Sequence, residues 1–251
     1  TISRAISGAG TVEFAGSGTY TLSGTNSYAG LTILTSGTLV VTNASALGSS
    51  GQGITVNGGV LDLQADVGAE PIILNGGSIA TSSGSGAFSG ALVLSTNTSF
   101  DVASGTLTVS GLISETGGSR SVTKTGNGTL ILSNANTYSG GTIVSAGILQ
   151  AGADSSGSPT VTSGPFGTGL VTIASGGVID LYGKTIGNAL NLSGSYGANV
   201  GALTNSVTSN QGVASGAVTL AANASVGGAG NILISGVITG SAKLTLIGSA
   251  T

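Results

Sequence analysis

Apolar residues in this chain come in short patches, in which they alternate with single polar residues or run together. The patches are rich in Val, Ile and Leu and are separated by Gly, Asn and Ser, which is typical of short β-strands joined by turns. No stretch carries the apolar stripe of an amphipathic helix. The pattern therefore predicts an all-β protein, with strands at residues 12–14, 20–22, 33–34, 39–41, 54–56, 61–63, 72–74, 92–94 and 107–109.

The chain also repeats itself over long distances. Residues 18–39 match residues 128–149 without a gap, at an offset of 110. Residues 2–19 match residues 234–251 in the same way, at an offset of 232. Matches of this length at fixed offsets indicate a tandem array rather than a single enzyme domain.

The two main copies differ in length. Their offset grows from 110 to 125 at Ile113 and Ile238, so the second copy contains 15 additional residues. Insertions that leave the order of motifs intact are expected in loops. We predict one continuous segment over residues 1–251, with long repeats at approximately 6–112 and 113–237 and the start of a third at 238–251.

Closely spaced short strands fit two architectures, an antiparallel sandwich and a parallel β-helix. Three observations favour the β-helix: the motif order holds along the whole chain, Asn-Gly hairpin turns are few, and small polar residues dominate the corners. We predict a right-handed parallel β-helix (β-solenoid) of roughly ten to twelve coils, with Leu, Ile and Val inside and Ser and Thr outside.

The composition excludes several kinds of catalytic and metal site. With no His and no Cys, the chain cannot build a Ser-His-Asp or Cys-His centre, or a zinc site of the common His/Cys types. We therefore predict that it is not an enzyme and that it needs no cofactor and no metal.

Charge and hydropathy exclude further classes of partner. Eight acidic and five basic residues are scattered without a run of either sign, so nucleic-acid binding is not expected. No stretch approaches 18 apolar residues, so insertion of this segment into a membrane is not expected. The chain begins at Thr1 without the plan of a signal peptide, which we interpret as a mature or internal piece of a longer protein.

Two segments share the pattern G-x-G-T-L-x-L-S-G-x-N-x-Y-x-G-G-T-x-V-x-x-G-x-L, at residues 18–39 and, more closely, at residues 126–149. Leu-Gly, G-G-x-L-D-L and S-G-x-I-S-G elements follow in order. This combination resembles the passenger-associated repeats (autotransporter-associated β-strand repeats) of bacterial autotransporters and giant repetitive surface adhesins. The resemblance implies a right-handed β-helical passenger, exported across the outer membrane and displayed at the cell surface.

Carboxylates are the remaining candidates for chemistry, because glycoside hydrolysis uses paired carboxylates. Asp62, Asp66 and Glu70 form the single local acidic cluster. Asp62 recurs as Asp180 within a shared G-G-V-(L/I)-D-L motif, so we interpret both as structural repeat positions. Asp66 and Glu70 have no acidic counterparts at the matching places near Lys184 and are expected to be solvated loop residues. The acidic residues are too dispersed for calcium sites.

A second recurring pair is an Asn followed two residues later by a Tyr: Asn26 with Tyr28, and Asn136 with Tyr138. These could form a row that contacts a ligand. We favour a structural role, in which the Asn bonds to backbone groups at a corner and the Tyr covers adjacent strands with its hydroxyl at the surface. The basic residues share no repeat position and are interpreted as solubility charges: Arg4, Arg120, Lys124, Lys184 and Lys243.

These features predict a non-catalytic structural segment of a secreted, extracellular fibre or adhesin stalk that mediates projection, adhesion or contact between cells. The expected partners are neighbouring repeats of the same chain, with homotypic contacts between fibres and glycans of host or other cell surfaces as further candidates. Two alternatives stay open. One is a self-assembling filament whose uncapped edges stack end to end; the other is a polysaccharide-degrading passenger that uses Asp62 or Asp66.

Overall fold

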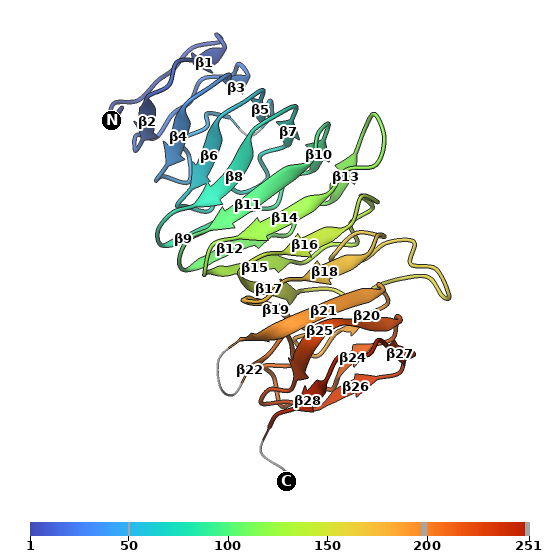
Figure 1. The fold of residues 1–251 in the computed structure, drawn as a ribbon. Helices are drawn as coiled ribbons and strands as arrows, with labels where there is room; N and C mark the ends of the chain where they lie inside the picture. The colour runs from blue at the N-terminus through green and yellow to red at the C-terminus, as the bar shows by residue number, and fades with distance from the viewer. Residues whose placement is uncertain (50, 197–199, 249–251) are drawn as a thin grey trace.

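The computed structural model describes residues 1–49, 51–196 and 200–248 as a parallel β-solenoid of about 11 turns. Residues 50, 197–199 and 249–251 lie outside this description, and with them the last three residues of the predicted third repeat. The described residues form 28 strands and no helix, and the chain runs in order from one end of the stack to the other (Figure 1). The predicted parallel β-solenoid is confirmed.

The strands stack in three parallel ladders, which we call the first, second and third faces. The chain visits them in that order in each turn. The first face contains β1 (Val12–Phe14), β3 (Thr32–Leu34), β5 (Ile54–Val56), β7 (Ile72–Leu74), β10 (Leu92–Leu94) and β13 (Ile113–Glu115). After two irregular segments it continues with β20 (Thr185–Ile186), β24 (Gly212–Ala214) and β26 (Ile232–Ile234).

The second face passes without interruption through the described stack. It contains β2 (Thr19–Leu22), β4 (Thr38–Val41), β6 (Val60–Leu63), β8 (Ser78–Thr81), β11 (Thr98–Val102), β14 (Val122–Thr125), β16 (Thr142–Val144), β18 (Val171–Ile173), β21 (Leu190–Tyr196), the start of β25 (Val218–Val226) and β27 (Ile238–Thr239).

The third face begins with irregular segments around Asn26, Ala46 and Val67, which stack through backbone bonds such as Val67 N–H to the Ala87 carbonyl. Regular strands follow: β9 (Ser85–Phe88), β12 (Thr106–Val109), β15 (Thr129–Leu132), β17 (Gly147–Ala151), β19 (Gly177–Asp180), β23 (Leu203–Thr204), the end of β25 and β28 (Leu244–Leu246). The short β22 (Val200–Gly201) folds back antiparallel on β21.

Alternation along each strand places every second side chain inside the stack. The ladder register then aligns like with like, so that Phe14, Leu34 and Val56 are successive buried residues of the first face. At the corners the backbones of successive turns lie in close contact. A Cβ on Gly30, for example, would lie 2.2 Å from the Gly10 carbonyl oxygen of the turn before it. Burial of each Leu, Ile or Val stabilises the stack by about 1.5–3 kcal/mol.

The additional residues of the second copy project from this stack. Between β17 and β18 the chain forms a hairpin in which Ser156 pairs with Ser163, visible as a long loop at the edge of Figure 1. Further along, Ser195 of β21 pairs with Gly201 of β22. No helix of the described part is long and apolar enough to span a membrane.

Candidate functional site

The Asn of each recurring Asn-Tyr pair joins three turns of the stack. The Asn26 amide oxygen accepts the N–H of Ile6 at 2.8 Å in the turn before, and its amide nitrogen donates to the Ala46 carbonyl at 2.5 Å in the turn after. Asn26 is 5% exposed, so these backbone groups occupy an amide that water hardly reaches. The side chain therefore works as a clip between turns.

Asn136 makes the same two bonds in the second copy. Its amide oxygen accepts the N–H of Ile113 at 2.8 Å, and its amide nitrogen donates to the Pro165 carbonyl at 2.8 Å. It is 1% exposed. Neither Asn is therefore placed to form a row of ligand contacts on the surface.

Tyr28 and Tyr138 differ from the expectation in one respect. Both side chains are buried, so the prediction that their hydroxyls reach the surface is wrong. The hydroxyls instead bond the Oγ1 atoms of Thr32 and Thr142, at 2.5 and 2.7 Å. A Thr four residues later thus supplies an internal partner, and burial raises the pKa of both tyrosines above the ordinary value.

Asp62 and Asp180 form equivalent clamps between turns. The Asp62 carboxylate accepts the N–H and the hydroxyl of Ser82 at 2.9 and 2.5 Å. Asp180 accepts the same two groups of Ser206 at 3.0 and 2.6 Å. Each Asp also accepts a Gln amide, from Gln64 in the first copy and Gln150 in the second. Because these donors occupy their oxygen atoms, both carboxylates have a structural role in joining turns of the stack.

The remaining residues of the acidic cluster lie in different surroundings. Asp66 is exposed and caps a turn by accepting the Gly68 N–H at 2.9 Å. Glu70 is 3% exposed, so the expectation that it is a solvated loop residue is wrong. Its burial raises the pKa of the carboxyl from 4.5 to about 7. Among the residues the structure describes, no group of three or more His, Cys, Asp or Glu is placed to hold a metal.

Lys124 likewise contradicts its interpretation as a solubility charge. Its side chain is fully buried, and Nζ donates to the carbonyls of Thr125, Gly126 and Ala146 at 2.5, 2.7 and 3.3 Å. Burial lowers the pKa of this amine from 10.5 to about 8. Arg120 folds onto its own turn, where it bonds the carbonyls of Thr116 and Gly117.

The other basic residues are more accessible to solvent. Arg4 and Lys243 are exposed and Lys184 is half-buried. The basic side chains therefore occupy separate surroundings along the rod.

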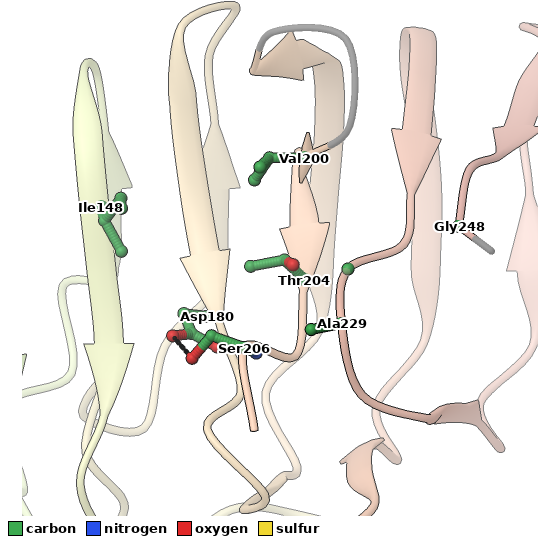
Figure 2. Close-up of a pocket in the computed structure, with 8 residues that line it drawn as sticks. Ile148, Asp180, Val200, Thr204, Ser206, Ala229 and Gly248 are labelled. Carbon is green, nitrogen blue, oxygen red and sulfur yellow. Dashed lines mark hydrogen bonds between the residues drawn. The ribbon is translucent and has the colours of Figure 1, made fainter. Parts of the chain in front are cut away.

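A groove of about 710 Å³ lies near Asp180. Figure 2 shows Asp180 and Ser206 bonded to each other there, with Ile148 and Val200 on other strands. Sequence reasoning missed this groove, since part of it depends on β22, which belongs to the insertions of the second copy. The signal for it was the growth of the repeat offset.

Comparisons with known proteins found one matching family and a similar protein. Residues 15–41 and 122–151 match the family described as passenger-associated-transport-repeat. A stretch of 98 residues, 38% of this chain, is 42% identical to the BmaC autotransporter adhesin of Brucella suis biovar 1 (strain 1330) and covers 2% of that protein. No solved structure matches. The predicted resemblance is thus confirmed for two segments of the chain, which match the passenger-associated-transport-repeat.

Proposed function

We propose that this chain is a non-catalytic structural segment of an extracellular fibre or adhesin stalk, displayed at a bacterial cell surface. The observation that carries the proposal is that the recurring polar side chains form hydrogen bonds between turns of the solenoid. Asn26, Asn136, Asp62 and Asp180 all bond one turn of the solenoid to another. Polar residues that recur in each repeat and bond neighbouring turns to one another stabilise the stack along its whole length.

A solenoid of this kind supports projection through the additivity of its turns. Each turn contacts its two neighbours through backbone bonds and buried apolar residues, so stability and length grow together. Local opening at one turn leaves distant turns paired. The proposed mechanism is therefore mechanical, with the rod holding other parts of a longer protein away from the cell.

Neighbouring repeats of the same chain are the proposed first partners. Homotypic contacts between fibres, and glycans of host or other cell surfaces, are the proposed external ones. The name of the BmaC adhesin, which shares 42% identity over 98 residues, supports a role in adhesion. The faces carry few charges, as eight acidic and five basic residues serve the whole chain, so rods can approach without strong repulsion.

The proposal is tested by removing residues 122–243 from the full-length protein on living cells. The deleted residues form 5⅓ turns, so at about 4.8 Å per turn the projecting fibre should become about 26 Å shorter. Display at the cell surface should remain intact. Removal of residues 157–162 is the matched control, because that loop adds no turn. Cryo-electron tomography measures the projection, and binding to host cells measures adhesion. An unchanged length after the larger deletion would refute the stalk function.

A second candidate is a self-assembling filament, in which the strand edges at the ends of separate solenoids stack end to end. Electron micrographs of the purified full-length protein separate the two candidates: filaments longer than a single rod favour assembly, and single rods favour the stalk.

The polysaccharide-degrading alternative is tested with the same material. Wild type, Asp62→Asn and Asp66→Asn are incubated with a panel of acidic glycans, and new chain ends are measured. Cleavage by the wild type that either variant lacks would replace the structural proposal with an enzymatic one. No cleavage by the wild type supports the stalk.

A further inference from the structure

Strands that match one another along the sequence lie on different faces of the rod. Val12 of β1 corresponds to Val122 of β14 at the offset of 110 and to Leu244 of β28 at the offset of 232. Yet β1 pairs with β3 on the first face, β14 with β11 and β16 on the second, and β28 with β25 on the third. Each long repeat therefore starts one face further round than the one before.

Other matched positions show the same step. Asp62 lies in β6 on the second face, and its counterpart Asp180 lies in β19 on the third. The Asn26 segment occupies the third face, where Ser27 N–H bonds the Ile6 carbonyl. The segment of Asn136 stacks on β13 of the first face. Since the third face is followed by the first, this is again a step of one face.

The number of faces in each repeat explains the step. From β1 to β13 the chain passes thirteen strands and the three irregular third-face segments, which makes sixteen faces. From β14 to β27 it also passes sixteen. These are twelve strands with one face each, the two faces of β25 and two irregular first-face segments, while β22 and the other loops of the second copy add residues and no face. Sixteen faces on a three-faced rod are five turns and one face over. The residue counts, 110 and 122, differ without altering this remainder.

We infer that the long repeat is a device for turning the display direction, so that equivalent surfaces of successive repeats point about one third of a revolution apart. This rests on the proposed function as an exposed rod. Equivalent sites step by about 26 Å along the axis and return to the same side after three repeats, about 77 Å, at about 4.8 Å per turn. The kind of partner that fits is a set of separate macromolecules, each spanning one repeat and approaching from a different side. A single flat partner meets one repeat in three.

Ile33 and Ile143 are suitable markers, because they match at the offset of 110 and both are outward residues. Ile33 is the middle residue of β3 on the first face, and Ile143, 40% exposed, is the middle residue of β16 on the second. The chain has no Cys, so paired Cys substitutions label cleanly. Two control pairs each stay on one face: Ile33 with Thr137, five turns apart, and Thr21 with Ile143, six turns apart.

Pulsed electron paramagnetic resonance on spin labels at these pairs tests the inference. The same-face pairs should be separated by about 24 and 29 Å, from five and six turns of about 4.8 Å. The pair Ile33→Cys/Ile143→Cys has an intermediate axial separation of about 26 Å, but a face of about seven residues at roughly 3.3 Å each adds a lateral displacement of about 23 Å. Its distance should therefore be the longest of the three, near 34 Å.

The order of the distances decides the matter. If the Ile33/Ile143 distance falls between those of the controls, equivalent surfaces lie in line and the inference is wrong. Circular dichroism of each labelled variant confirms that it has kept its fold. The measurement does not depend on adhesion, so a failed adhesion assay with the expected distances would refute the proposed function alone.

Discussion

Glu70 offers the sharpest test of the energetics of the stack. It precedes Pro71 and β7, is 3% exposed, and its Oε2 has no partner within the described residues. Burial raises its pKa from 4.5 to about 7. Asn188, which matches Glu70 at the offset of 118 shared by Asp62 and Asp180, donates its amide to the Gly167 and Gly169 carbonyls at 3.1 and 2.8 Å. The position thus favours a donor, which a carboxylate cannot be.

The sign of the pH dependence follows from the raised pKa. Between pH 4.5 and 7 the folded chain retains a proton that the unfolded chain has lost, so the free energy of unfolding falls as pH rises through this window. A pKa that moves from 4.5 to about 7 corresponds to a loss of at most about 3 kcal/mol, at about 1.4 kcal/mol per pH unit. The contribution of the protonated carboxyl is complete at and below pH 4.5.

Glu70→Gln removes this titration and supplies an amide donor like that of Asn188. We expect equal stability of variant and wild type at pH 4.5, and a variant more stable by up to about 3 kcal/mol above pH 8. Native-state hydrogen exchange at Ile72, whose N–H bonds the Ala91 carbonyl, reads the local free energy of opening. Asp66→Asn, at an exposed carboxylate, is the control. A variant with the same pH slope as the wild type would falsify the reasoning.

Three further predictions concern single positions. Asn136→Ala breaks both backbone bonds and leaves their buried partners unsatisfied, which should cost about 2–4 kcal/mol in denaturant unfolding; a loss below 1 kcal/mol would contradict the clip. The lowered pKa of Lys124 predicts that wild-type stability rises from pH 8 to 10.5, where the unfolded chain still holds the proton, and Lys124→Met should abolish that rise in pH-dependent melts. Gly30→Ala places Cβ 2.2 Å from a backbone oxygen and should destabilise by about 1–3 kcal/mol, while Gly10→Ala, with open space around it, should melt like the wild type.

The course of the backbone was predictable from the sequence. Short alternating patches such as residues 54–56 and 92–94 became ladder strands, and Gly-rich intervals became corners. The parallel arrangement followed from the preserved order of motifs, because a stack of similar turns repeats its sequence whereas a sandwich need not. These features depend on local pattern and copy number, both of which are written in the chain.

Buried polar residues were harder to predict, because residues of these types are usually exposed to solvent. Lys124 has the same parity as Val122 within β14 and matches Phe14 at the offset of 110, which places it inside. Glu70 has the parity of Ile72. For Tyr28, the missing information was the position of Thr32, whose hydroxyl supplies the internal partner. Strand parity thus carried the signal in the first two cases, and the third needed the geometry of the turn.

The step between repeats shows what specifies a face. One motif forms β1 on the first face, β14 on the second and β28 on the third, so no face requires a sequence of its own. Each strand needs apolar residues at alternate positions and a neighbour in matching register, and every face supplies both. Because the faces are interchangeable in this way, a repeat of sixteen faces costs the rod no more than one of fifteen. Fifteen faces would align all equivalent surfaces on one side, and the sixteenth distributes them around the axis.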